Sequence, residues 1–210
     1  MATDVTPTHS MAAASEATAP RKKGIRTMLL YLLLGFVVLL AALALFVASR
    51  PNHFEVSRSM LIDAPPSAIF PHVHNLRAWK AWSPYEKVDP NMTQSYEGPD
   101  SGQGAVMRWS GNSQAGAGST EIMESVPDER IDILLTMTKP MNCQNDVRFT
   151  FQPQGEATLV TWHMQGKVGF VPKIFHLIIN MDQMVGGQFE EGLTALKSLA
   201  EQEATATVDL

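Results

Sequence analysis

The sequence predicts an α+β protein in which a curved antiparallel β-sheet wraps around one long C-terminal α-helix, preceded by a single N-terminal transmembrane helix. Three patterns indicate this fold class. Residues 28–48 form an uncharged apolar run, residues 93–166 hold short segments separated by turn residues, and residues 174–199 carry an apolar stripe of helical period. With 45% hydrophobic and 18% charged residues, the chain of 210 residues has the composition of a globular protein.

The apolar run from Met28 to Ala48 is 21 residues long. A helix of that length rises about 31 Å, which matches a hydrocarbon core of about 30 Å. Four basic residues precede the run within residues 21–26, whereas Arg50 is the nearest basic residue after it. The positive-inside rule therefore predicts a single-pass membrane protein with a cytoplasmic N-terminus and its main domain on the periplasmic or extracellular side.

The chain accordingly divides into four parts. We expect a disordered cytoplasmic tail at 1–26, a transmembrane helix at 27–49 that meets the lipid bilayer through residues 28–48, a folded domain at 53–202 and a disordered tail at 203–210. A cleaved signal peptide is the alternative for the apolar run. The anchor is favoured because the run exceeds the roughly 7 to 15 apolar residues of a signal peptide.

The folded domain begins with a strand at about 53–62, where apolar and polar side chains alternate. The segment 64–66 (Ala-Pro-Pro) ends this strand. A short helix follows, because apolar side chains then recur at spacings of three and four, at Ile69, Phe70, Val73, Leu76 and Trp79. Trp79, Trp82 and Tyr85 gather where this helix gives way to a loop at Pro84.

Six further segments have strand character and suggest an antiparallel meander: Thr93 to Glu97, Gly104 to Ser110, Ser119 to Val126, Arg130 to Thr138, Asp146 to Pro153 and Ala157 to Gly166. Gly, Pro, Asn and Asp mark the turns between them. The last two segments alternate cleanly. The apolar face of the first of them carries Val147, Phe149 and Phe151, and that of the second carries Val160, Trp162 and Met164.

The C-terminal stripe from Ile174 to Leu199 predicts a helix that runs to about Gln202. Gly186 and Gly187 interrupt the stripe, and we expect either a kink or a close approach to the sheet at this point. A sheet with one apolar face has to bury it, and this helix has the matching stripe. Since one helix cannot fill a strongly curved sheet, a space lined by aromatic and Met side chains is expected between them.

Several stretches together carry a family resemblance: Arg58-Ser-Met-Leu-Ile-Asp-Ala-Pro-Pro66, Trp79-x-x-Trp-Ser-Pro-Tyr85, Asp89-Pro-Asn-Met92, Thr158-x-Val-Thr-Trp162 and Phe189-Glu-x-Gly-Leu193. Over residues 53–202 the chain resembles the polyketide cyclase/dehydrase branch of the SRPBCC (START-like, helix-grip) superfamily. The resemblance implies the helix-grip fold. It says less about function, because members that are similar in shape include lipid carriers, receptors and cyclases.

A ligand site is expected from strand alternation and from what the resemblance implies about the cavity. The candidate ligand-binding residues are Trp82, Tyr85, Trp109, Phe149, Trp162, Met164, Ile178 and Met181. The alternative interpretation, which the abundance of aromatic residues in protein cores favours, is that Trp79 and Trp82 pack in the core and that Tyr85 is a surface aromatic. Glu121 and Arg108 have apolar neighbours, but alternation favours an outward position for both, so no catalytic residue is assigned.

Other site classes find little support in the sequence. His72 and His74 point about 200° apart on a helix and cannot chelate one ion, and a lone Cys143 offers neither a disulfide nor a thiolate cluster. The sequence also has no glycine-rich phosphate loop. Taken together, these observations lead us to expect neither a metal nor a cofactor. The chain after residue 26 has a net charge of −7, which disfavours nucleic-acid binding.

Three functions follow as hypotheses. The first is a membrane-anchored domain that binds a small hydrophobic ligand, such as a lipid, an isoprenoid or a polyketide-like molecule. The second is a cyclase or dehydratase that uses the same cavity, which would require a titratable side chain pointing inward. The third is a cell-envelope interaction module with a filled core. The sequence does not indicate the oligomeric state.

Overall fold

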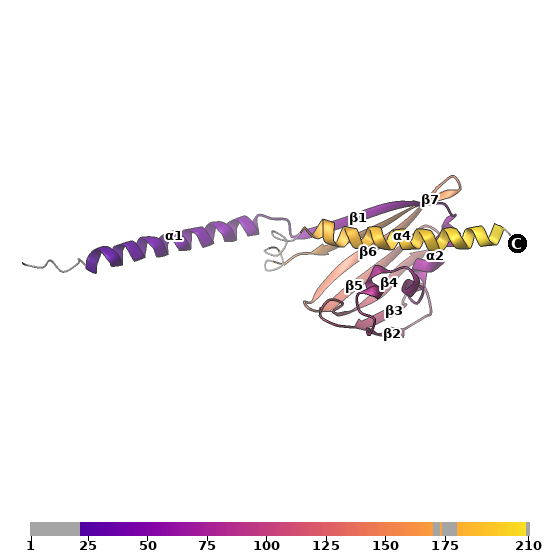
Figure 1. The fold of residues 1–210 in the computed structure, drawn as a ribbon, viewed down its shortest axis with the longest axis horizontal. Coiled ribbons are helices and arrows are strands. Elements are labelled where there is room, and N and C mark those ends of the chain that lie inside the picture. Colours follow the sequence, from indigo (N-terminus) through magenta and orange to yellow (C-terminus); the bar gives the residue numbers. More distant parts are fainter. Residues whose placement is uncertain (1–21, 170–172, 174–179, 209–210) are drawn as a thin grey trace, which may run out of the picture. The chain divides into compact units, whose positions relative to one another are not determined.

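The computed structural model describes residues 22–169, 173 and 180–208. The chain forms two compact units, Met1–Phe46 and Val47–Leu210. The first unit is dominated by helix α1 (Lys22–Ala48; Figure 1). Most of the apolar side chains of α1 are exposed. Residues Gly24–Ala48 are long and apolar enough to cross a bilayer, a test that an N-terminal signal sequence passes as well.

The second unit is built on a sheet of seven antiparallel strands in the order β1-β7-β6-β5-β4-β3-β2. The strands are β1 (His53–Ile62), β2 (Thr93–Glu97), β3 (Val106–Ser110), β4 (Ala117–Val126), β5 (Arg130–Lys139), β6 (Cys143–Gln154) and β7 (Ala157–Lys167). The predicted meander is thus confirmed from β2 to β7. β1 adds to its far edge by pairing with β7 along its whole length, from His53 opposite Lys167 to Ile62 opposite Thr158.

The expected single helix after β1 is interrupted. Helix α2 (Pro66–His74) ends at Asn75, whose backbone is extended, and the chain then forms two short 3₁₀ helices, η1 (Ala78–Ala81) and η2 (Pro84–Lys87). The side chain of Asn75 accepts a hydrogen bond from the backbone N–H of Arg77, which stabilises the break. The sequence pattern missed this break because both sides of it are apolar and buried.

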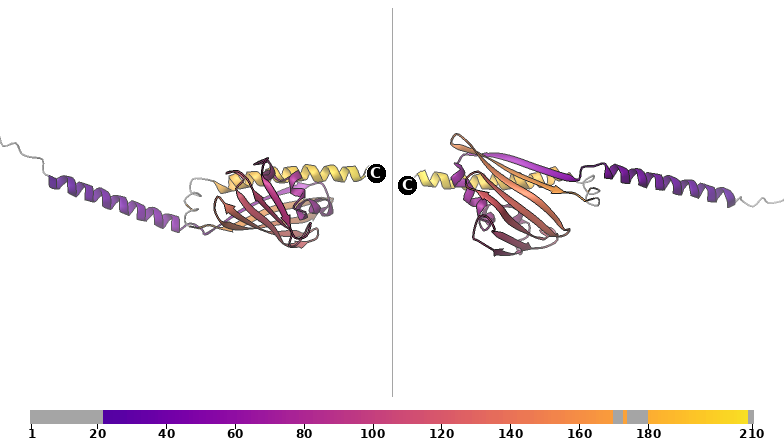
Figure 2. Two further views of the ribbon diagram at one scale, coloured as in Figure 1. Left: turned by 90° about the horizontal axis from the view of Figure 1, so that it is seen from below. Right: turned by 180° about the vertical axis from the view of Figure 1, so that it is seen from behind.

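Helix α4 (Met181–Val208) lies along β1 on one face of the sheet, as the three views show (Figures 1 and 2). The prediction of a disordered tail at 203–210 is wrong for residues 203–208, which continue the helix. Tertiary contacts explain the difference. Ala204 packs against the core, and the carboxylate of Glu203 lies 3.0 Å from Nε2 of His72 in α2.

Alternation along the strands gives the sheet an inner face, which bears the core, and a polar outer face. The inner-face residues of β6 and β7 include Phe149 and Trp162, which are directly opposite each other. The buried residues of the hydrophobic core lie between Val56 and Ala200, and the partly buried ones packed against them between Phe54 and Ala204, so the second unit holds a core of its own.

The two ends of the sheet differ in what covers them. We call one the α2 end, where β1 finishes at Ile62 and where α2 packs against the sheet and α4. We call the other the β1-start end, where His53 pairs with Lys167 and Cys143 pairs with Met137. The chain arriving from α1 enters the second unit at the β1-start end, since Asn52 accepts a hydrogen bond from the N–H of Val168 there.

Candidate ligand-binding site

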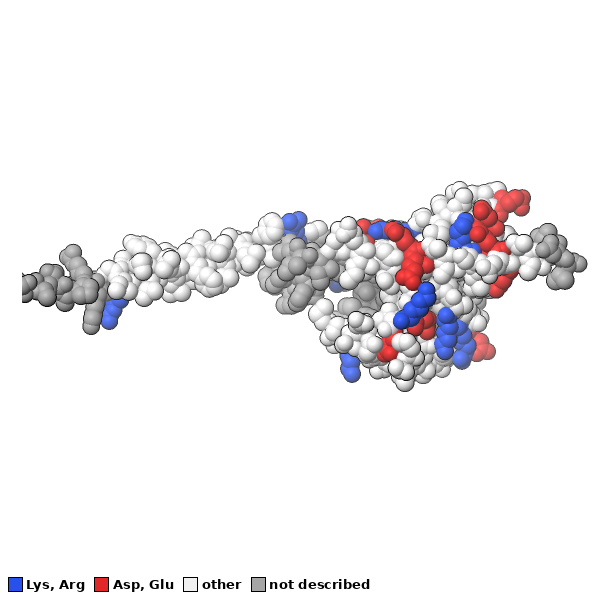
Figure 3. Space-filling view, viewed as in Figure 1, with Lys and Arg blue, Asp and Glu red and all other residues white. Residues whose placement is uncertain are grey.

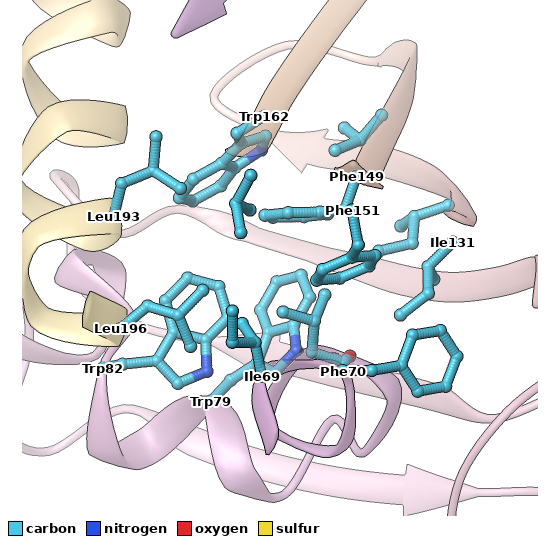
Figure 4. Packing of buried hydrophobic residues seen from close by; sticks show 14 of the residues in the cluster. Ile69, Phe70, Trp79, Trp82, Ile131, Phe149, Phe151, Trp162, Leu193 and Leu196 are labelled. Atoms are coloured by element: carbon cyan, nitrogen blue, oxygen red, sulfur yellow. Dashed lines mark hydrogen bonds between the residues drawn. The ribbon is translucent and has the colours of Figure 1, made fainter. Parts of the chain in front are cut away.

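At the α2 end the inner face is filled by a closed aromatic cluster. Trp162 of β7 stacks on Phe189 of α4 with ring centroids 4.1 Å apart, and it contacts Phe149 at 4.8 Å. Trp82, the residue directly after η1, meets both Trp162 and Phe149 edge-on, at 5.7 and 6.0 Å. In the close view, Leu193 and Leu196 of α4 reach the same cluster (Figure 4). This half of the domain is packed like an ordinary protein interior.

Hydrogen bonding separates the three buried tryptophans of this cluster. Trp79 donates its indole N–H to the carbonyl of Val73 at 3.0 Å, and Trp82 donates to the carbonyl of His72 at 2.9 Å. The Nε1 of Trp162 is equally buried but has no hydrogen-bond partner. A buried donor without a partner costs free energy, so the indole of Trp162 is positioned by packing, including its stacking on Phe189, and not by a hydrogen bond.

The inner face is covered less completely toward the β1-start end. Several apolar side chains that point inward there are only half-buried: Phe54, Trp109, Leu135, Met137 and Val185. The space-filling view shows the surface hollowed beneath the N-terminal half of α4 (Figure 3). Among the residues that the structure describes, the cover of the sheet is thus closed at the α2 end and less complete at the β1-start end.

A row of paired residues crosses the sheet in this less covered half. It contains Asn145 of β6 between Leu135 of β5 and Gly166 of β7, and it ends at Phe54 of β1. Asn145 is only 8% exposed, and its Oδ1 has no hydrogen-bond partner. A buried unpaired amide oxygen is rare in folded proteins, and it marks this position as unusual.

One charged side chain, Arg58, stands on the inner face among the strand residues that the structure describes. Arg58 is in phase with Val56 on β1, lies opposite Trp162, and forms ion pairs with two carboxylates of α4: Asp182 at 2.9 Å and Glu190 at 2.6 Å. The hydrogen bond with Asp182, followed by that with Glu190, raises the pKa of Arg58, and the same contact lowers the pKa of Asp182. Arg58 therefore fixes α4 to the sheet.

The structure brings together five of the residues predicted for the site. Trp82, Tyr85, Phe149 and Trp162 belong to the aromatic cluster, where Tyr85 meets Trp162 edge-on at 6.4 Å, and Met164 follows Trp162 on the same face of β7. Trp109 lies further across the inner face on β3 and donates its indole N–H to the carbonyl of Ala115.

The other two predicted site residues give less information. Ile178 lies outside the described residues, and Met181 is the first residue of α4, with a side chain that is likewise not described.

Two residues of the inner face were missed by the sequence argument, namely Arg58 and Asn145. Both stand in phase with apolar neighbours two positions away, so the period-two pattern contained the signal. An inward polar residue in an apolar row is costly to bury, so such a residue indicates a candidate functional position.

On the described strands, the inner face carries few titratable side chains that could support acid–base chemistry. Glu121 and Arg108 are on the outer face, as alternation predicted, and Arg108 pairs with Glu97. Cys143 is on the inner face, but burial raises the pKa of its thiol and keeps it protonated. No group of three or more His, Cys, Asp or Glu side chains suited to a metal ion occurs among the described residues.

Solved structures share the fold. A protein of unknown function from Staphylococcus aureus aligns with a TM-score of 0.54 at 14% identity, over 73% of this chain and 96% of its own. A protein from Chromobacterium violaceum aligns with a TM-score of 0.51 at 16% identity, over 72% and 99%. A third, from Mesorhizobium loti, gives a TM-score of 0.51 at 14% identity, over 71% and 98%. No curated protein sequence matches the chain.

The sequence itself matches one family over most of its length. Residues 53–201, from the first residue of β1 to the last third of α4, match the family described as "Polyketide cyclase / dehydrase and lipid transport". The matched range holds the whole sheet, the aromatic cluster and the row through Asn145. The chain therefore belongs to the polyketide cyclase/dehydrase and lipid transport family, and its second unit has the helix-grip fold of the SRPBCC superfamily.

Proposed function

We propose that this protein is a membrane-anchored START-like domain that binds a small hydrophobic ligand between the inner face of its sheet and α4. The observation that carries the proposal is the uneven cover of the inner face. Most inner-face side chains at the α2 end are fully buried, among them Ile62, Ile131 and Val160, whereas Phe54, Leu135 and Met137 at the β1-start end are half-buried on the same apolar face. Membership of a family that includes lipid transport supports the same function.

The ligand class follows from the chemistry of this face. Its side chains are aliphatic, aromatic and thioether groups, which favour an apolar body such as that of a lipid, an isoprenoid or a polyketide-like molecule. The single inner-face cation on the described strands, Arg58, is already paired with two carboxylates. A neutral ligand suits such a face better than an anion does.

The proposal places α1 in a membrane, with residues 1–26 in the cytoplasm and the second unit on the periplasmic or extracellular side. The length and composition of Gly24–Ala48 support the span, and the basic residues before it support the orientation. An anchored domain of this kind would keep an apolar ligand close to the bilayer into which it partitions.

A cyclase or dehydratase activity is the weaker candidate. Such a reaction needs a group that moves a proton in contact with the substrate. Within the strands that the structure describes, no carboxylate or histidine stands on the inner face, and Arg58 is bound in its ion pairs.

Native mass spectrometry tests the proposal. The second unit, residues 47–210, is purified from cells and measured intact, and any bound molecule is then extracted and identified. We expect a stoichiometric apolar adduct. A ligand-free mass that persists after incubation with a mixed lipid extract contradicts ligand binding and favours an interaction module with a filled core.

A further inference from the structure

The unpaired oxygen of Asn145 points to a specific feature of the ligand. Asn145 stands on the inner face of β6, directly between Leu135 on β5 and Gly166 on β7. The residue is nine-tenths buried, yet its Oδ1 accepts no hydrogen bond. An apolar residue of similar size would avoid the cost of this unpaired oxygen, so a purely structural role does not explain an asparagine here.

Neighbouring residues fix the direction of the side chain. Its Oδ1 lies over Gly166, where the Cβ of any other residue would stand, and the ring edge of Phe54 comes within 2.7 Å of the same position. Cys143 lies two residues earlier on the same face of β6. The amide oxygen of Asn145 is thus turned toward Gly166 and Phe54.

The described neighbours of this oxygen on the sheet are apolar, apart from the weakly polar thiol of Cys143. Next to it on the inner face are Leu135, Phe54, and the two residues of the following row, Val147 and Met164. An amide oxygen in such a place accepts a hydrogen bond from a donor that brings no charge with it. A hydroxyl group meets both conditions.

We infer that Asn145 accepts a hydrogen bond from a hydroxyl group of an otherwise apolar ligand. The ligand body lies along the half-buried side chains of the β1-start end, and the ring of Phe54 moves to admit the hydroxyl to Oδ1. This inference rests on the proposed function, since it names the chemical class of the ligand for the same site.

Two matched probes test it by isothermal titration calorimetry on residues 47–210. 1-Dodecanol carries a hydroxyl, whereas dodecyl methyl ether has the same alkyl chain and an oxygen without a hydrogen. We expect wild-type protein to bind the alcohol about tenfold more tightly than the ether, because a tenfold difference in Kd corresponds to the free energy of one buried hydrogen bond. Asn145→Leu should bind both probes equally, and Asn142→Leu, the same change at an exposed turn residue, should keep the preference.

Thermal unfolding without a probe supplies the second readout. Because Oδ1 is unpaired, Asn145→Leu should unfold at the wild-type temperature or above it. A lower unfolding temperature together with an unchanged preference for the alcohol shows that Asn145 is structural, and it overturns the inference. Equal binding of both probes by the wild type also overturns the inference alone, whereas binding of neither probe counts against the proposed function itself.

Discussion

The guanidinium of Arg58 occupies the space that a side chain at Gly186 would need. A Cβ at residue 186 would overlap with Nη2 and the central carbon of the guanidinium, so α4 approaches β1 this closely only because residue 186 is a glycine. Of the two outcomes expected at the glycine pair, the close approach is the one found. The carboxylates of Asp182 and Glu190, four residues to either side, hold the guanidinium in this place.

Replacing this glycine should therefore destabilise the domain. Gly186→Ala forces Arg58 or the helix to move, at a cost of about 1 to 3 kcal/mol. Gly187→Ala is the matched control, because nothing lies within 4 Å of a Cβ at that position, and its better helix propensity should leave stability unchanged or raise it by about 1 kcal/mol. Urea unfolding followed by tryptophan fluorescence measures both. Equal effects of the two variants would contradict the close approach.

The ion pair between Arg58 and Asp182 should make stability depend on pH. The hydrogen bond from Arg58 lowers the pKa of Asp182, so this carboxyl stabilises the fold above its unfolded pKa of about 3.9 and loses that contribution as the pH falls through its lower folded value. Wild type should unfold at a higher temperature than Asp182→Asn at about pH 6, and the difference should disappear by about pH 2. A difference that is independent of pH would show that the pair contributes nothing through charge.

The tryptophans of the aromatic cluster should respond differently to the same substitution. Trp82→Phe leaves the carbonyl of His72 without its donor, which adds about 1 to 3 kcal/mol to the cost of lost packing. Trp162→Phe removes an indole N–H that has no partner, so it should cost less, although Trp162 is as deeply buried as Trp82. Chemical denaturation of both variants measures the difference. A greater cost for Trp162→Phe would contradict the expectation that the hydrogen bond of Trp82 decides the order of the two costs.

The strands were predictable because a half-buried strand records its two faces in its sequence. Val147, Phe149 and Phe151 alternate with Asp146, Arg148 and Thr150, and the structure places the first three on the inner face. The same rule located the outward position of Glu121. The pattern predicts on which face of the sheet each side chain lies. The pairing of the strands then fixes that position.

Features that depend on tertiary contact were not predictable in this way. The break of the helix at Asn75 and the continuation of α4 to Val208 are set by local hydrogen bonds and by packing of Ala204, which no periodic pattern records. The roles of Arg58 and Asn145 required the partners across the sheet to be known. A polar residue in phase with an apolar row was the available sign, and its meaning came only from the structure.

The central claim is that a ligand lies on the inner face at the β1-start end, and methyl NMR of methionine-labelled protein tests it most directly. Met137 and Met164 stand on the inner face in this half, whereas Met123 is exposed and serves as the internal control. On titration of residues 47–210 with 1-dodecanol, we predict saturable shifts of the Met137 and Met164 methyl signals and none of the Met123 signal. Unchanged signals at Met137 and Met164 across the titration would contradict the account.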